Sequence, residues 1–313
     1  MSDTERMIAC CMHGFSPADH AGLALHDAGA DSWSKVLSTV ASLGFTALEI
    51  ADSHIRPADL DAKRRGELRQ AADSAEIDFA AVHVQRKSVI DPKHGEYNLD
   101  YAHRTIDAAA ELGCRVFSTG LHQPFTQAQQ EALWFWTAQG WKDPDDPEVR
   151  GLAVARLREL GQHAAEVGMP MSLEMYEDTY LGSADSAVRL IEEIGLDNVG
   201  LNPDIGNLIR LHRPIEDWRQ MHEKTLPYAN YWHMKNYQRD EAADGTWVTT
   251  HPTTLRDGLI DYRSVVDRAF ELGFTGPFLM EQYGGDSLGV CAENRTYLAG
   301  LLKSRDSMKG DGR

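Results

Sequence analysis

The chain has 313 residues, 42% hydrophobic and 25% charged, which is the composition of a soluble globular protein with a substantial core. Its net charge of −17 disfavours a nucleic-acid groove or an anionic membrane surface as partner, because either would repel it. We find no basic segment followed by a long apolar run at the N-terminus, and no run near the ~18 apolar residues of a membrane span. We therefore expect a cytoplasmic protein that binds neither nucleic acid nor membrane.

Taken in order, the chain repeats one helix-to-strand junction, in which a helix end is followed by glycine and then by an apolar run. Glycine ends a helix in a left-handed cap, so the junction predicts a β/α repeat. We predict strands at residues 8–15, 47–52, 79–84, 116–121, 171–176, 199–202, 229–233 and 277–281. Helices alternate with them at residues 32–43, 57–74, 99–112, 146–167, 183–194, 215–225, 262–272 and 287–303.

This alternation predicts a fold of the α/β class, a (β/α)8 TIM barrel that forms a single domain over residues 1–313. Two long connections, at about 123–145 and 236–258, follow strands and therefore fall on the face where barrel active sites lie. The first is rich in tryptophan, which indicates that it packs against another part of the protein or against a partner. We expect either a lid over the substrate or a subunit interface. Trp136 is the candidate substrate-binding residue of this connection.

Polar residues stand near the ends of the last four strands. Glu174 lies in a short apolar run, and an unpaired buried carboxylate is costly, so it needs a partner. Asp204, His233 and Glu281 hold the same place in later repeats, and strands about 4.8 Å apart would bring all four together at one rim. Taken singly, each is more simply a buried ion-pair member or a core histidine. Together they predict one hard, octahedral divalent cation rather than a thiolate-bound structural zinc.

Five motifs contain or follow these residues: Leu173-Glu174-Met175, Asn202-Pro203-Asp204-Ile205-Gly206-Asn207, Trp232-His233-Met234-Lys235-Asn236, Gly258-Leu259-Ile260-Asp261-Tyr262 and Met280-Glu281. In them the chain resembles the xylose isomerase-like barrel superfamily of sugar isomerases and epimerases, from residue 8 to about 302. The resemblance implies that the four residues bind one cation, Mn²⁺ first, with Mg²⁺ or Co²⁺ as alternatives. It also implies that Glu174 and Glu281 exchange the proton α to a keto sugar's carbonyl, while the cation stabilises the enolate.

Two positions depart from the epimerase pattern. Asn207 stands where many such enzymes have histidine, and Lys235 begins a segment that replaces an Arg/Gly-rich one. We treat both as candidate substrate-binding residues, and the departures put simple epimerisation of a free ketose in doubt.

Histidines at other strand ends supply further candidates. His122, which follows the fourth predicted strand, is the candidate general acid or base, because histidine titrates near working pH. A histidine that only makes hydrogen bonds at the rim is the alternative. His13 and His83 are candidate substrate-binding residues. Surface or loop positions are predicted for His20, His26, His94, His103, His163, His212 and His222.

Four functions remain open. The leading prediction is a metal-dependent sugar isomerase or epimerase that acts on a small keto sugar as a homo-oligomer. The chain also resembles the catalytic α subunit of a C-glycoside deglycosidase, whose enolate expels an aromatic aglycone from a 3-oxo-glucoside beside a small β subunit. An endonuclease at abasic DNA is opposed by the charge of −17. The non-enzyme alternative is a binding module with a structural or decayed metal site.

Overall fold

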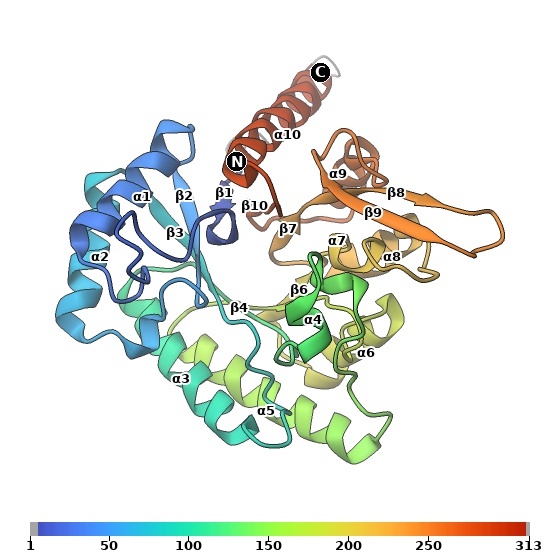
Figure 1. Ribbon diagram of the computed structural model, residues 1–313, viewed down its shortest axis with the longest axis horizontal. Coiled ribbons are helices and arrows are strands. Elements are labelled where there is room, and N and C mark those ends of the chain that lie inside the picture. The colour runs from blue at the N-terminus through green and yellow to red at the C-terminus, as the bar shows by residue number, and fades with distance from the viewer. Residues whose placement is uncertain (1–5, 311–313) are drawn as a thin grey trace.

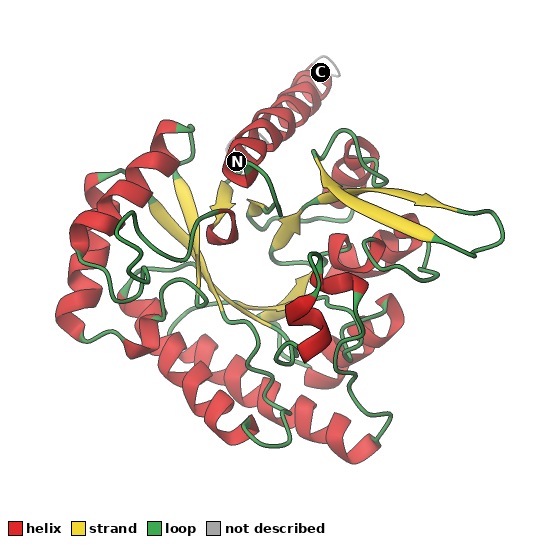
Figure 2. Cartoon of the chain, in the orientation of Figure 1, coloured by secondary structure: helices red, strands yellow, loops and turns green. Residues whose placement is uncertain are grey.

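The computed structural model describes residues 6–310, so the predicted domain's outermost residues, 1–5 and 311–313, lie outside the described residues. Eight parallel strands curve into a barrel that is surrounded by helices (Figures 1 and 2). The predicted (β/α)8 TIM barrel, a single domain, is confirmed. No helix within residues 6–310 has the length and apolar character needed to cross a bilayer.

The strands lie in the sheet order β6-β5-β4-β3-β2-β1-β10-β7. Their bounds are β1 (Ile8–Cys11), β2 (Ala47–Ala51), β3 (Asp78–His83), β4 (Val116–Thr119), β5 (Met171–Glu174), β6 (Val199–Asn202), β7 (Trp232–Met234) and β10 (Phe278–Met280). The seam between β6 and β7 is held by a parallel bridge of Leu201 with Ala229. Here the side-chain oxygen of Asn202 also accepts a 2.8 Å hydrogen bond from the backbone N–H of His233.

The predicted helices are all present. They are α1 (Ala30–Ser42), α2 (Ala62–Ser74), α3 (Gly95–Glu111), α5 (Pro147–Glu166), α6 (Ala184–Ile194), α8 (Trp218–Thr225), α9 (Tyr262–Glu271) and α10 (Ser287–Gly310). The predicted helix at 57–74 is split into η3 (Pro57–Asp59) and α2, because Asp61 caps α2 by accepting from the Arg64 N–H at 2.8 Å. The first strand is shorter than predicted, since the chain turns into η2 (Met12–Gly14).

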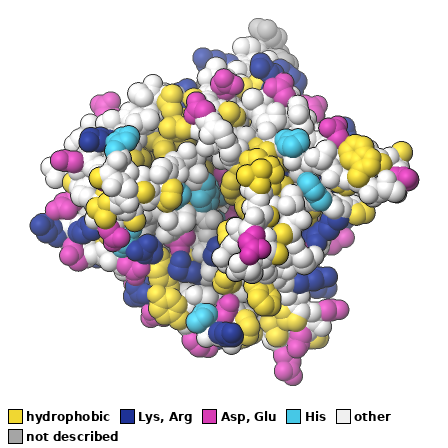
Figure 3. Space-filling model, in the orientation of Figure 1, with side chains coloured by type: hydrophobic (Ala, Val, Ile, Leu, Met, Phe, Trp, Pro, Cys, Tyr) yellow, Lys and Arg dark blue, Asp and Glu magenta, His cyan; other side chains and the backbone are white. Residues whose placement is uncertain are grey.

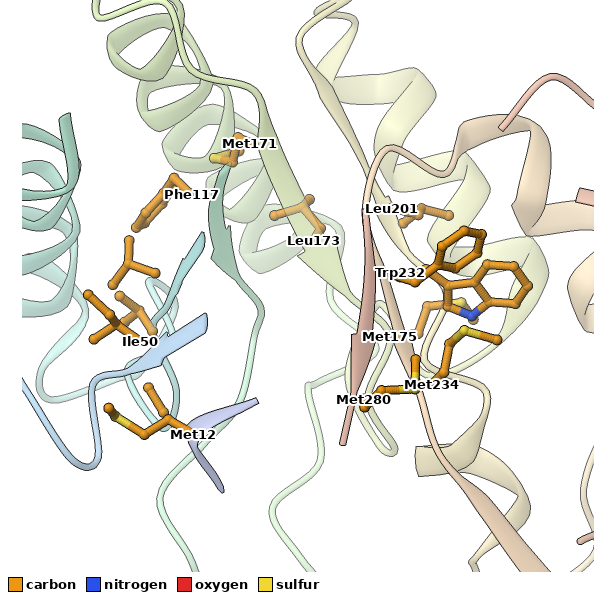
Figure 4. Close-up of a cluster of buried hydrophobic side chains, with 14 of the residues drawn as sticks. Met12, Ile50, Phe117, Met171, Leu173, Met175, Leu201, Trp232, Met234 and Met280 are labelled. Carbon is orange, nitrogen blue, oxygen red and sulfur yellow. The ribbon is translucent and has the colours of Figure 1, made fainter. Parts of the chain in front are cut away.

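The apolar core has two layers because strand residues alternate between the two sides of the barrel wall. The outer layer lies between strands and helices, and Figure 4 shows part of it, including Phe117, Leu173 and Trp232. The inner layer is small and fills the barrel near the start of the strands, with Ala9, Ala47, Ala80, Ala81, Val116, Tyr231 and Leu279. Beyond this inner apolar layer, toward the carboxyl ends of the strands, the side chains that point into the barrel are polar. They form the floor of the site described below.

The two long connections contain structure of their own. The first holds α4 (Gln127–Glu131) and η4 (Phe135–Thr137), and the second forms an antiparallel hairpin of β8 (Asn236–Glu241) and β9 (Val248–Thr253). Asn236 anchors the hairpin, because its Nδ2 donates to the carbonyls of Leu255 and Ile260 at 2.9 Å each. The short α7 (Gly206–Ile209) and η5 (Leu226–Tyr228) complete the helical elements.

The surface or loop prediction is wrong for His222, which lies inside α8 and is 2% exposed. His26 lies in a turn, as predicted, although its side chain is buried. The His222 Nδ1–H donates to the Trp218 carbonyl at 2.7 Å, the contact expected when an amphipathic helix turns a histidine inward. Burial lowers the pKa of His222 to about 4, so the ring is neutral at physiological pH. All four cysteines are free and buried.

Candidate active site

Glu174, Asp204, His233 and Glu281 meet at the carboxyl ends of neighbouring strands. One potential ligand atom from each lies within 4.8 Å of the others, and all four side chains are buried. Glu174 ends β5, and His233 is central in β7. Asp204 follows β6 after one intervening residue, and Glu281 follows β10 directly. The alternation of the strands explains the geometry: Leu173 and Met234 face the helices, so Glu174 and His233 face inward.

The tautomer of His233 is fixed by a residue on the far side of the barrel. His233 Nε2 lies 2.8 Å from a carboxylate oxygen of Glu49 in β2, so Nε2 carries the proton and donates. The same carboxylate accepts from the Tyr231 hydroxyl and, at 3.1 Å, from the Cys11 thiol. Burial alone would raise the pKa of Glu49, but His233 lowers it to about 2. Glu49 is therefore ionised and holds the ring.

The opposite edge of His233 faces carboxylates. Its Nδ1 lies 3.1 Å from Glu281 Oε2 and 3.3 Å from Glu174 Oε1, without a hydrogen bond to either. Despite burial, Glu49 and these carboxylates raise the pKa of His233 well above its usual value, so this edge of the ring attracts positive charge, either a proton or a metal ion. Asp204 Oδ1 is likewise buried and lacks a hydrogen-bond partner. Such groups fit a cation, and three carboxylates with one imidazole suit Mg²⁺, Mn²⁺ or Co²⁺. The cluster could therefore hold a divalent cation.

Lys235 lies inside this cluster rather than at its edge. Its Nζ is 2.6 Å from Asp204 Oδ2 and 2.8 Å from Glu281 Oε2, and the side chain is 1% exposed. Burial raises the pKa of Asp204 to about 6, although Lys235 acts in the opposite direction. The Lys235 side chain can lie between Asp204 and Glu281 because residue 206 is glycine, since a Cβ at residue 206 would overlap the Lys235 Cγ. The motif glycine thus places a positive charge between two candidate ligands.

Three further histidines surround the glutamates. His83 Nε2 and His122 Nε2 lie 3.0 and 2.9 Å from Glu174 Oε2, and His13 Nδ1 lies 3.5 Å from Glu281 Oε1. Burial lowers the pKa of His122 to about 4 despite Glu174. Burial also opposes the charged form of His83, but Glu174 and Glu49 together outweigh it and raise the pKa of His83. His83 Nδ1 is also 2.8 Å from the Ser118 hydroxyl. Figure 3 shows histidine side chains in the recess at the centre of this face.

Asn207 connects two of the candidate ligands. Its Nδ2 donates to Glu174 Oε1 and Asp204 Oδ2, both at 3.1 Å, and to the Met175 carbonyl at 3.0 Å. These contacts occupy the side-chain amide donors, so the structure places Asn207 behind the carboxylates. Its role in this arrangement is to orient them.

Trp136 forms part of a wall beside the site, not of the carboxylate cluster. Its Nε1 donates to Thr250 in β9 at 3.2 Å, and its ring meets Tyr237 and Tyr283 edge to face, with centroids 5.4 and 5.9 Å apart. The wall encloses the guanidinium of Arg210, whose Cζ lies 5.2 Å from the Trp136 ring centre. Arg210 Nη2 also contacts both Glu177 oxygens, at 3.1 and 3.0 Å. The aromatic insertion is thus packed against its own chain.

A comparison with protein families matches residues 37–305 to the xylose isomerase-like TIM barrel. The chain belongs to this family. A crystal structure of a xylose isomerase-like TIM barrel protein from Mycobacterium smegmatis, in complex with magnesium, is 43% identical; the match covers 97% of this chain and 99% of that one, with a TM-score of 0.92.

More distant structures share the fold of this xylose isomerase-like barrel. A xylose isomerase domain protein from Planctomyces limnophilus is 17% identical, with 95% of this chain and 96% of that one covered and a TM-score of 0.68. D-psicose 3-epimerase from Clostridium cellulolyticum H10, with D-tagatose, is 15% identical, with coverage of 95% and 99% and a TM-score of 0.68. At such identities the likeness shows the fold alone. No curated protein sequence matched the chain.

Sequence reasoning about this family member missed two residues of the site region. Glu49 sits in the middle of an apolar strand, Ala47–Ala51, and a buried carboxylate in an apolar run is the same signal that singled out Glu174. Glu49 lies in the middle of its strand, whereas the predicted site residues lie near strand ends. Arg210 had no comparable signal, since its burial depends on an aromatic insertion that is remote in sequence.

Proposed function

We propose that this protein is a divalent-cation-dependent enzyme that removes the proton α to the carbonyl of a keto sugar and returns it as an isomerase or epimerase. The observation that carries this proposal is the arrangement of Glu174 and Glu281. Both carboxylates face the Nδ1 edge of His233, and within 3.5 Å Glu174 also has His83 and His122, whereas Glu281 has His13. Two carboxylates with separate proton-transfer neighbours at one centre suit removal and return of a proton.

The cation would be held by Glu174, Asp204, His233 and Glu281, with Mn²⁺ as our first choice and Mg²⁺ or Co²⁺ as alternatives. When bound, it would supply Lewis acidity that polarises the substrate carbonyl and stabilises negative charge on its oxygen. The donor set and the magnesium complex of the 43% identical relative support a divalent cation at this position.

The proton would pass between carboxylates of this chain. We assign its removal to Glu174, whose Oε2 lies between His83 and His122, and its return to Glu281, beside His13 and Lys235. His122, neutral because its pKa is about 4, would exchange a proton with a substrate hydroxyl. His13 and His83 would bind substrate oxygens, while Asn207 and Lys235 keep the carboxylates in place. Burial of all these groups would exclude water, which strengthens each electrostatic contact.

We further propose that the aromatic insertion covers the substrate. Its inner residues pack beside Glu281 through Tyr283, whose ring centroid lies 6.0 Å from that of Phe135. Its outer residues are exposed: Leu133 is 89% and Trp141 60% exposed, and Trp247 of the neighbouring hairpin is 54% exposed. Exposed large apolar residues gathered on two insertions support the expectation of a homo-oligomer.

The aromatic wall also supports a second function, that of the catalytic α subunit of a C-glycoside deglycosidase. The same proton removal would then be followed by expulsion of an aromatic aglycone from a 3-oxo-glucoside. Phe135 and Trp136 pack against Tyr283, which follows Glu281 by two residues, and together they offer the apolar surface that a flat leaving group would need. A small β subunit would be required as partner.

Metal analysis and isotope exchange test the proposal together. Mass spectrometry should find near-stoichiometric Mn²⁺, Mg²⁺ or Co²⁺ in the wild type and its loss in Glu174→Gln and Asp204→Asn, with the exposed Glu216→Gln as matched control. Keto sugars and 3-oxo-C-glucosides are then incubated with the enzyme in deuterated water. An isomerase or epimerase incorporates deuterium into an intact sugar, whereas a deglycosidase releases the free aglycone. No bound metal after reconstitution would contradict both functions.

A further inference from the structure

Outside the barrel mouth, two histidines form a cluster between neighbouring helices. His103 and Asp107 stand one turn apart on α3, and Glu159 and His163 stand one turn apart on α5, so each helix presents one imidazole and one carboxylate. The two rings lie 5.0 Å apart between centroids and are tilted by 33°. α3 and α5 run side by side on the outside of the barrel (Figure 1).

Each imidazole is held from the opposite helix. His103 Nε2 is 3.0 Å from Glu159 Oε1, and His163 Nε2 is 3.0 Å from Asp107 Oδ1. An ionised carboxylate only accepts hydrogen bonds, so both Nε2 atoms carry protons and donate. In neutral rings both Nδ1 atoms are then unprotonated. They lie 2.8 Å apart, so two lone pairs point at each other unless a cation lies between them.

We propose that His103 and His163 form a second metal site, for a transition-metal cation of the Zn²⁺ class bound by the two Nδ1 atoms. Metal-bound histidines typically donate their other N–H to a carboxylate, as both rings do here. Zinc–nitrogen bonds of about 2.0–2.1 Å in tetrahedral geometry place the two nitrogens about 3.3 Å apart, so the rings need to separate by ~0.5 Å and to turn until both lone pairs meet at the cation. The side chains are 28% and 19% exposed, which leaves the remaining coordination positions open to water.

This site differs from the barrel centre in both chemistry and place. Two nitrogen ligands favour borderline cations such as Zn²⁺, whereas the carboxylate-rich centre suits harder ones. His163 is in the last turn of α5, the end that leads back to the start of β5. Since active sites lie at the carboxyl ends of barrel strands, bound Zn²⁺ would join α3 to α5 on the opposite, stability-determining face.

The test is Zn²⁺ titration of the full chain in excess Mg²⁺, followed by calorimetry. The same titration in a Glu174→Gln/Asp204→Asn background excludes binding at the barrel centre. We expect one Zn²⁺ in both backgrounds, an affinity loss of at least tenfold in His103→Ala and His163→Ala, and no change in the exposed control His94→Ala. Asp107→Asn and Glu159→Gln should each weaken binding by about 10-fold or more, because they hold the rings.

Folding of every variant is checked by circular dichroism, and His103→Gln provides a second variant of similar polarity. Zn²⁺ should also raise the melting temperature of the wild type but not that of either alanine variant. Zinc binding that is unaffected by loss of both histidines would overturn the proposal. So would the absence of Zn²⁺ binding in the double-variant background, which would mean that a shared proton alone lies between the rings.

Discussion

Asp143, in the aromatic insertion, is a buried carboxyl that has no cationic partner within residues 6–310, and its replacement by asparagine should stabilise the protein at neutral pH. One oxygen accepts from the Tyr180 N–H at 2.9 Å, and the Gln123 side chain also favours the ionised form, but neither partner carries a charge. Burial raises its pKa from 3.8 to about 6. A difference of roughly 2 pKa units corresponds to about 3 kcal/mol between the two protonation states.

The sign follows from the raised pKa. The folded protein binds this proton more strongly than the unfolded chain, so the contribution of Asp143 is most favourable below pH 3.8 and is lost as pH rises through about 6. Asparagine keeps an oxygen for Tyr180 and does not ionise. Asp143→Asn should therefore equal the wild type near pH 4 and exceed its unfolding free energy by about 2–3 kcal/mol above pH 7.

Urea denaturation at a series of pH values between 4 and 8 measures this difference, with the exposed Asp145→Asn as control. The variant's advantage should grow between pH 4 and 6 and then level off, and the control should show no such trend. A difference that does not change with pH, or a variant that is less stable above pH 7, would refute the assignment of an uncompensated buried charge.

Three further substitutions test the site and its wall. Glu49→Gln should lower Mn²⁺ affinity by about 10- to 100-fold in equilibrium dialysis, because the His233 ring loses its anionic partner. Gly206→Ala should displace Lys235 and reduce deuterium exchange by about 100-fold, while metal stays bound. Trp136→Ala, which empties a buried site, should destabilise the protein by about 3–5 kcal/mol in urea denaturation.

Each of these has a matched comparison. The exposed Glu216→Gln should leave Mn²⁺ affinity unchanged, and equal affinity in Glu49→Gln would mean that His233 needs no anionic support. Wild-type exchange in Gly206→Ala would show that the position of Lys235 is irrelevant. Trp141→Ala, at an exposed position of the same insertion, should alter stability by no more than about 0.5 kcal/mol. A similar loss at both tryptophans would indicate that the insertion unfolds as a unit.

The charge pattern of the barrel centre explains why Gly206 and Lys235 matter together. Glu174, Asp204 and Glu281 are close and buried, and carboxylates in such a place repel one another. Lys235 offsets part of this charge from within the cluster, and the Asn207 amide bridges two of the three groups. His233 Nδ1 and Asp204 Oδ1 are the buried atoms of the cluster that make no hydrogen bond, so they are available to bind a cation.

The sequence alone determined the barrel and much of its centre. Apolar runs of strand length alternate with amphipathic helices, and a glycine at each helix end marks where the next strand begins. The strand ends could therefore be compared from repeat to repeat without information on tertiary contacts. Because parallel strands end at one rim, Glu174, Asp204, His233 and Glu281 could be expected to converge. Both the barrel and the convergence of these residues follow from local periodicity, which can be read directly from the amino-acid sequence.

Only the tertiary structure decided which groups hold that centre in place. Glu49 reaches His233 across the barrel, from a strand 184 positions away in the chain, and Trp136 meets Thr250 across 114 positions. The pairing of His103 with His163 depends on two helices that pack side by side only after the barrel closes. Such contacts depend on how twisted strands and their helices are placed in space, and local sequence pattern carries no information about the distance between residues so far apart.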